Sequence, residues 1–321
     1  MNMMKGEFEM VAGSSGNLNM PKISIVTPIY NGIAHTLEYL ESLTKIVYPN
    51  YEIIIVDDGS TDGSSETIAR AFPQVRLLKG DGNLWWSGAT NLGIADALSR
   101  GTDFILTMNN DVQAASDCLD ALCGCACDNA GAIVGGKIYF MDEPNRIWSA
   151  GGELSWWNGK TLVLLGHGCA DSPGFSQRRK VDFFTGMCVL IPASVFMRIG
   201  YYDAIDFPQY HADTEFTLRA KAAGIPLIFE PTARIWNRVE STFMQRFLKH
   251  GSLTCHDIKE LLTSFRSPMN IKEYWLLHRR FCPLMLLPIA FGLRMLRMAF
   301  FLGKIRWALR KGGSAVEKIG I

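Results

Sequence analysis

The sequence lacks several features that membrane-spanning, secreted and zinc-binding proteins need. The uncharged apolar run at residues 281–293 is too short to span a bilayer comfortably. Residues 1–19 contain no apolar segment typical of a secretory signal, so we expect residues 1–20 to form a flexible leader. The eight cysteines do not form two separated Cys-x-x-Cys pairs near a histidine. This disfavours zinc and predicts reduced, buried thiols in a cytosolic protein.

The charge is nearly balanced overall but unevenly distributed along the chain. The net charge is +1, and residues 270–321 hold ten Lys or Arg against two Asp or Glu, which is +8 and leaves −7 for the rest. A basic, apolar tail on an acidic body favours an anionic surface such as a membrane as partner. Nucleic acid is a weaker interpretation, because stacking motifs and recognition signatures are absent.

Short Ile/Val-rich runs alternate with helical patterns, which predicts an α/β fold with a mostly parallel sheet flanked by helices. The expected strands are residues 23–28, 52–56, 75–78, 104–108, 132–138, 181–191 (broken at Thr185-Gly186) and 225–229. The expected helices are residues 36–43, 64–72, 89–99, 115–129 and 213–223. Hairpin signals surround Gly159. The predicted domains are 21–250, divided into halves 21–140 and 141–250, and a helical extension at 251–321.

Polar side chains follow three of the expected strands. They are Thr27, Asn31, Asp57, Asp58 and Asp111. In open parallel sheets, ligands bind beyond the carboxyl ends of the strands. The pattern therefore places hydrogen-bond acceptors and a candidate metal ligand where a nucleotide would sit.

Five segments in order carry a resemblance to a known family. VTPIYN, VDDGSTD, the NND at a strand end, FFTGMCVLIPASVF and YHADTEFTLRAKAAG resemble the family 2 glycosyltransferases, which have the GT-A fold, over residues 22–243. GDGNLWWSGATNLGI is similar to the subset that includes rhamnosyl- and related transferases of bacterial surface polysaccharides. The resemblance implies an inverting enzyme that moves a sugar from a nucleotide-diphospho-sugar to a saccharide or lipid-linked saccharide.

The resemblance also implies a donor site. In the family an acidic residue of the DDGS motif accepts the N3–H of a pyrimidine, which here is Asp57 or Asp58. Trp85 and Trp86 are candidates for stacking on a base or sugar, although packing in the core is equally compatible with the sequence. Thr185-Gly186 resembles the family's TG pair, in which the missing side chain of the glycine lets donor and acceptor approach closely. The remaining donor-binding candidates are Thr27, Pro28, Asn31, Asn91, Asn109 and Asn110.

A Mg²⁺ or Mn²⁺ site is implied at Asn109-Asn110-Asp111, which stands at the position of the family's DXD motif. Asp111 is the expected metal ligand, and the alternative role for it is a helix N-cap. The family's second ligand is often a His, but Asn237 stands near that position and offers a neutral carbonyl oxygen. Arg234 and Arg238 are alternatives for neutralising the diphosphate.

The catalytic base implied by the resemblance is Asp213. A helix N-terminus there favours the ionised carboxylate. Ala212 replaces the usual Glu, and His211 either compensates for it or faces solvent. Glu215 is expected to orient neighbours such as Arg219. His35 and His167 have no motif support and are interpreted as surface or core residues.

The extension predicts a helix lying in a membrane interface. On a helical wheel Arg294, Arg297, Lys304 and Lys311 fall within about 100° of one another, opposite the apolar residues 300–302. The alternative is a helix packed on the body. We therefore expect a cytoplasmic enzyme held peripherally at the inner face of the cell membrane.

Two other functions compete with glycosyl transfer. A nucleotidyltransferase that makes the activated sugar would show a Gly-rich, basic loop after its first strand, and VTPIYNGIAHTLE lacks one. A non-catalytic module that binds nucleotide sugars is the other, with Ala212 and Asn237 marking lost activity. Nucleic acid is not an expected partner of any of these.

Overall fold

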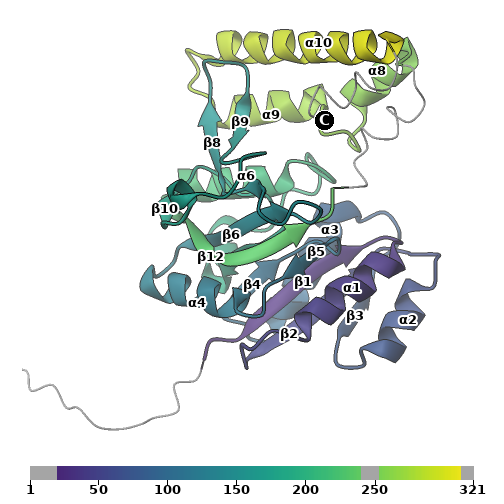
Figure 1. The fold of residues 1–321 in the computed structure, drawn as a ribbon, viewed down its shortest axis with the longest axis vertical. Helices are drawn as coiled ribbons and strands as arrows, with labels where there is room; N and C mark the ends of the chain where they lie inside the picture. The colour runs from purple at the N-terminus through teal and green to yellow at the C-terminus, as the bar shows by residue number, and fades with distance from the viewer. Residues whose placement is uncertain (1–19, 240–252, 312–321) are drawn as a thin grey trace, which may run out of the picture.

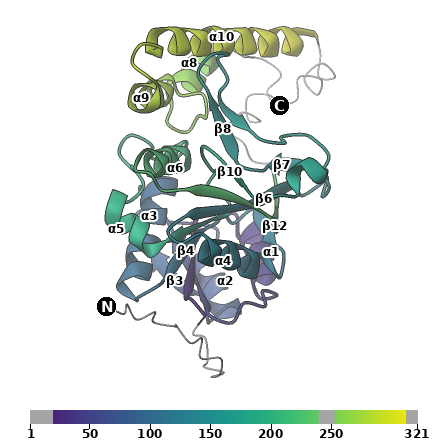
Figure 2. The same ribbon diagram turned by 90° about the vertical axis from the view of Figure 1, so that its left-hand side faces the viewer.

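The computed structural model describes residues 20–239 and 253–311 (Figure 1). Almost all of the predicted leader, the predicted boundary at residue 250 and the last ten residues of the predicted extension lie outside these ranges. The described chain forms an α/β body with a helical layer above it, as both views show (Figures 1 and 2).

The body is built on a ten-stranded mixed sheet. Four strands run parallel in the order β3 (Arg76–Lys79), β2 (Tyr51–Asp57), β1 (Ile23–Ile29) and β4 (Phe104–Thr107). Their predicted ends are correct within one residue. In β1, Ile23 and Ile25 pack on one face and Val26 on the other. Helices must therefore cover both faces of the sheet. Because these strands are buried on both faces, their sequences are continuous apolar runs.

The other half of the sheet departs from the predicted parallel order. β11 (Val189–Pro192) runs antiparallel between β4 and β6 (Ile133–Phe140), and β12 (Leu227–Asn237) is parallel to β6. Only the end of the predicted strand 181–191 is strand, whereas β12 continues eight residues beyond its predicted end. Short strands complete this half: β5 (Val112–Ala114), β7 (Ile147–Ser149) and β10 (Arg179–Lys180).

Helices cover both faces of the sheet, forming three layers (Figure 2). The helices on one face are α1 (Ile33–Leu43), α2 (Ser64–Ala71) and α4 (Cys118–Asp128), and those on the other are α3 (Trp85–Ser99), α5 (Ala193–Ile199) and α6 (Ala212–Ala222). A 3-10 turn spans Pro173–Phe175. The cysteine-rich segment forms α4, and all eight cysteines, which lie within the described ranges, carry free thiols. Five of them are buried as predicted, whereas Cys127, Cys169 and Cys255 are exposed.

The extension contains α8 (Cys255–Thr263), α9 (Ile271–Phe281) and α10 (Leu287–Lys311), which share a small core around Leu261 and Ile305. The predicted hairpin is present as β8 (Gly152–Ser155) and β9 (Thr161–Leu164), and it rises from the body to α10 (Figure 1). At its tip a Cβ on Gly159 would lie 2.6 Å from the carbonyl oxygen of Leu293. Within the described ranges, no helix combines the length and apolarity needed to cross a bilayer.

The basic face predicted for α10 is wrong in one essential respect. Arg294 points inward, and its guanidinium lies 3.8 Å from the ring centroid of Tyr274. Leu302, predicted to face a membrane, is buried in the extension's own core, with Phe301 packed beside it. Residues 300–302 also do not form one apolar face opposite the basic residues, because successive residues of a helix lie 100° apart.

Glu273 in α9 predicts an unusual dependence of stability on pH. Its side chain is buried, its oxygens lack hydrogen-bond partners among the described residues, and burial raises its pKa to about 9. Because the folded pKa exceeds the unfolded one, this residue lowers stability progressively as pH rises from about 4.5 to 9. We expect Glu273→Gln to raise the free energy of unfolding by about 2–3 kcal/mol at pH 7 and by little at pH 4.5. Urea unfolding of both proteins across this range measures the difference, and parallel pH curves would contradict it.

Candidate active site

The site is assembled at the carboxyl ends of β1, β2 and β4, beginning with Asp58. Both carboxylate oxygens of Asp58 accept backbone N–H groups of the next loop: Oδ1 from Gly82 and Oδ2 from Trp85, each at 2.9 Å. The residue is buried. Asp58 therefore fixes the loop that leads into α3 and holds it against the end of β2.

Asp57 stabilises the turn that follows β2. Its Oδ1 accepts the backbone N–H of Ser60 at 2.8 Å, and its Oδ2 accepts the hydroxyl of Ser65 in α2. Asn31, in the left-handed region at φ 58°, accepts the N–H of Thr61 at 2.9 Å. The polar residues after β1 and β2 are thus brought together as predicted, largely by bonding one another's backbone.

Two predicted donor contacts have other partners in the structure. The buried hydroxyl of Thr27 lies 2.6 Å from the hydroxyl of Tyr39, beneath α1, so Thr27 is a core residue, while its neighbour Pro28 is half-buried. The side-chain amide of Asn91 both donates to and accepts from the backbone of Tyr202, at 2.9 and 3.0 Å. We therefore infer that neither Thr27 nor Asn91 contacts a donor. Asn91 instead positions the Tyr202 segment.

The two tryptophans have different surroundings. Trp85 has a left-handed backbone, at φ 58°, and its ring packs edge-on against Phe265 at 4.8 Å, with the guanidinium of Arg266 4.5 Å from the ring centroid. Trp86 donates its indole N–H to Oδ1 of Asn109 at 2.9 Å. A left-handed conformation is costly for a bulky residue, so the contacts of Trp85 must hold it there.

Gly186 allows close contact between the two halves of the body. A Cβ at this position would lie 2.6 Å from Cζ2 of Trp86 and 3.3 Å from Cβ of Asp213. Only glycine lets the indole and the start of α6 approach so closely. Gly186, Trp86, Asn109 and Asp213 are therefore neighbours, although they come from distant parts of the chain.

Asp213 lies in the first turn of α6 and is half-buried. Its Oδ2 accepts the backbone N–H of Gly186 at 2.7 Å and its Oδ1 that of Thr214 at 2.6 Å. Burial raises the pKa of this carboxyl, and the two N–H bonds oppose that shift without cancelling it. The helix N-terminus alone favours a lower pKa, as the sequence predicted, but burial outweighs it.

His211 is half-buried and contacts the extension. It precedes α6 with a left-handed backbone, at φ 61°, and its Nε2 lies 3.2 Å from the carbonyl oxygen of Pro268. Its ring packs against Tyr274 of α9, and burial lowers its pKa to about 4. His211 is therefore neutral near pH 7 and joins the start of α6 to the extension.

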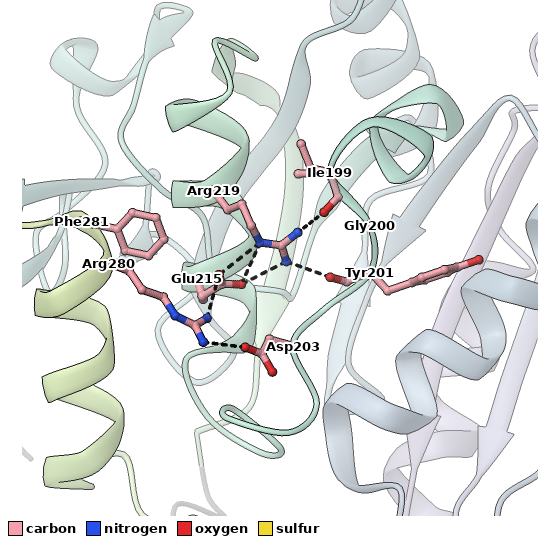
Figure 3. A pocket seen from close by; sticks show the side chains of 8 residues that line it. All are labelled: Ile199, Gly200, Tyr201, Asp203, Glu215, Arg219, Arg280 and Phe281. Carbon is pink, nitrogen blue, oxygen red and sulfur yellow. Dashed lines mark hydrogen bonds and ion pairs between the residues drawn. The ribbon is translucent and has the colours of Figure 1, made fainter.

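Glu215 occupies a hollow next to the extension, shown in Figure 3. Its carboxylate contacts Arg219, as predicted, at 3.1 Å, and also Arg280 of α9 at 3.1 Å. Arg280 continues to Asp203 at 2.8 Å. Because residues two apart on a helix point to different sides, Glu215 points away from the face that carries Asp213. Its role is to attach α6 to the extension.

Asp111 follows β4, and one of its carboxylate oxygens has no hydrogen-bond partner among the described residues. Within the described chain, Oδ1 of Asp111, Oδ1 of Asn237 and Nδ1 of His35 are buried without hydrogen-bond partners. Burial raises the pKa of Asp111, and the charges of His35 and Arg238 oppose the shift. His35 was not predicted to take part. It stands in the first turn of α1, where Asn110 also bonds Thr36 at 2.9 Å.

An unpartnered buried carboxylate oxygen suits a hard divalent cation. The backbone places Asn237 close by, because it pairs with Val112 across β5 and β12 and Arg238 donates its N–H to the carbonyl of Asp111 at 3.0 Å. Across residues 20–239 and 253–311, however, no three His, Cys, Asp or Glu side chains gather into a metal site. The residues fit a cation that takes most of its ligands from phosphate and water.

The sequence did not predict the residues that the extension contributes, above all Phe265, Arg266 and Arg280. They lie outside the segments that carry the resemblance, and contacts between distant helices leave no local pattern. Tyr202, which packs edge-on against Trp86 at 5.3 Å, was missed for the same reason.

Both the sequence and the fold resemble those of known proteins. The sequence matches the family described as "Glycosyl transferase family 2" over residues 24–200. The N-acetylglucosaminyl-diphospho-decaprenol L-rhamnosyltransferase of Mycobacterium tuberculosis (strain ATCC 25618 / H37Rv) is 26% identical over 233 residues, which are 66% of this chain and 75% of that protein. Glycosyltransferase GlyG of Streptococcus pneumoniae serotype 4 is 34% identical over 125 residues, 38% of this chain and 40% of that protein.

A solved structure supports the likeness of fold. The structure described as "GalNAc-T7 with UDP, GalNAc and Mn2+" superposes with a TM-score of 0.57 at 16% identity. The superposition covers 70% of this chain and 44% of that one, so the chain spans less than half the length of this neighbour. At this identity the likeness concerns the fold alone.

Proposed function

The chain belongs to glycosyl transferase family 2, and on that basis we propose that it catalyses an inverting sugar transfer from a nucleotide-diphospho-sugar. It is a glycosyltransferase of the hexosyltransferase type. The proposed acceptor is a saccharide or lipid-linked saccharide in surface polysaccharide synthesis. The similarity to a transferase whose name includes a decaprenol-linked substrate supports a lipid-linked acceptor.

The observation that carries the proposal is the setting of Asp213. Its carboxylate is held by the N–H groups of Gly186 and Thr214, next to the indole of Trp86. In the proposed reaction Asp213 takes the proton of the acceptor hydroxyl, whose oxygen attacks the anomeric carbon in line as the nucleoside diphosphate leaves. A carboxyl with a raised pKa is a stronger base once it has ionised than an ordinary Asp.

The donor is proposed to lie between Asp58 and Asp111. Asp58 keeps further lone pairs for a base N–H beside its two backbone bonds, one of which comes from Trp85, and Asn109 accepts the indole N–H of the neighbouring Trp86. Asp111, with Asn237 nearby, would hold Mg²⁺ or Mn²⁺. When bound, such a cation neutralises the charge that develops on the diphosphate.

A panel of nucleotide sugars tests the donor site by thermal shift, with and without Mn²⁺. A donor at 100 times its dissociation constant should stabilise the protein by about 2.7 kcal/mol. We expect one nucleoside diphosphate class to raise the melting temperature, and Mn²⁺ to increase that shift in the parent but not in Asp111→Asn. A panel without any stabilising nucleotide sugar would contradict the proposal.

The raised pKa of Asp213 predicts how the rate depends on pH. The base must be ionised, so kcat at saturating donor should fall as pH decreases through a pKa above the usual 3.8 of Asp. A pH–rate profile from pH 8 to pH 4 measures the position of this acidic limb. A rate that stays constant down to pH 4 would contradict the role of Asp213 as base.

A further inference from the structure

The outer side of α10 carries a row of large apolar side chains exposed to solvent. Ile289 is 56% exposed, Leu296 70%, Phe300 66% and Trp307 58%. At 100° per residue these four positions fall within about 40° of one another, in a straight row along the helix. Leu284 and Met285, in the turn before α10, are also exposed, at 79% and 92%. We call these six residues the α10 row.

The row is distinct from the side of α10 that stabilises the extension. Met298, Leu302 and Ile305 are buried against α8 and α9 and account for the packing of the helix. Figures 1 and 2 show α10 as the outermost layer, on the side of α9 away from the sheet. Exposed apolar side chains in such a row are costly in water, and their arrangement is typical of a surface that contacts another phase or molecule.

Positive charge accompanies the row on both sides. Arg297 and Lys304 fall about 60–80° from it on one side, and Arg306 about 100° on the other; all three are exposed. α10 contains neither Asp nor Glu. Beneath the Arg297 side lies a hollow of about 320 Å³ between α10 and β9, lined by Lys160, His167, Arg294 and Arg297 among others.

We propose that the α10 row rests on an anionic lipid bilayer, with the apolar side chains in the acyl boundary and the flanking cations against the headgroup phosphates. A row containing Leu, Ile, Phe and Trp between Lys and Arg residues matches the chemistry of that boundary. The proposal keeps Phe300, Arg297 and Lys304 from the surface that the sequence predicted but excludes Leu302 and Arg294, which point inward. It extends the proposed function by giving the enzyme a place beside a lipid-linked acceptor.

Vesicle sedimentation of the full chain tests this surface without donor or turnover. The probes are phosphatidylcholine vesicles with and without phosphatidylglycerol. The double variant Leu296→Glu/Phe300→Glu should reduce the partition coefficient on anionic vesicles about tenfold or more. Arg297→Gln/Lys304→Gln should lose about fivefold for each cation removed and should weaken the salt dependence. Both pairs are exposed, so the melting temperature should change little.

The matched control is Met197→Glu/Ile205→Glu, which replaces two other apolar residues, 84% and 91% exposed, outside α10. It should bind vesicles as the parent does. Equal binding of the parent and Leu296→Glu/Phe300→Glu would overturn the proposal, as would failure of the parent to bind. A dimer of the parent that is abolished by Leu296→Glu/Phe300→Glu would assign the row to a second copy of the chain. Release of the protein from vesicles by inorganic phosphate alone would assign the cations to free phosphate. Either result would overturn the proposal. Transfer to a soluble acceptor is unaffected by any of these outcomes, so the proposed function is tested separately.

Discussion

Replacing Asp213 by Asn should lower kcat by about 10²- to 10⁴-fold while leaving the donor dissociation constant nearly unchanged. Asn cannot accept the hydroxyl proton. Its carbonyl oxygen can still accept one of the two backbone bonds that now come from Gly186 and Thr214, and its volume is nearly that of Asp. The defect should therefore appear in the chemical step, and product formation at saturating donor measures it.

Asp120→Asn is the matched control, because Asp120 is an exposed carboxylate in the first turn of α4, outside the site. It should retain the parental rate. If Asp213→Asn turned over as fast as the parent, Asp213 would not be the base. If the parent itself bound donor without turnover, the chain would behave as a non-catalytic module, as the replacements at Ala212 and Asn237 first allowed.

Replacing Asp58 by Ala should have the largest effect on stability and on donor binding together. The substitution leaves the partly buried N–H groups of Gly82 and Trp85 without their charged acceptor, at a cost of about 2–4 kcal/mol in unfolding free energy. It also frees the backbone of Trp85 from the contact that helps to hold it in the left-handed region. Urea unfolding and calorimetric titration of the donor measure the two effects.

Asp81→Ala is a control in the same loop. Asp81 accepts one exposed N–H, from Asn83 at 2.8 Å, and its loss should cost less than about 1 kcal/mol. Asp58→Asn should fall between the two, because its amide oxygen can accept only part of the pattern. Loss of donor affinity without loss of stability in Asp58→Ala would show that the backbone bonds contribute less than the structure indicates.

The sequence was sufficient for the parts of the fold with a strong local signal. β1 to β4 are buried on both faces, so their apolar runs stop where the strands stop, and their ends were predicted within one residue. The motif order was sufficient to identify the family. The bond between Gly186 and Asp213 was not predicted, although both residues belong to segments that carry the resemblance.

The remaining features depend on partners that are distant in sequence. Nothing local distinguishes the antiparallel β11 from a parallel strand, because both are short apolar runs. The sequence predicts Thr27 as a donor contact because it does not reveal the bond to the hydroxyl of Tyr39. It predicts Arg294 as a surface cation because it does not reveal the contact with the ring of Tyr274. The pKa of Asp213 depends on burial, which the helix-terminus argument does not include.

The anomeric configuration of the product tests the central claim most directly. The proposed mechanism has a single base at Asp213 and the leaving diphosphate on the opposite side of the sugar, which permits one in-line displacement. Proton NMR of the new glycosidic linkage, formed from a donor of known configuration, should show the inverted anomer. A product that retains the donor's configuration would contradict a single in-line displacement with Asp213 as base.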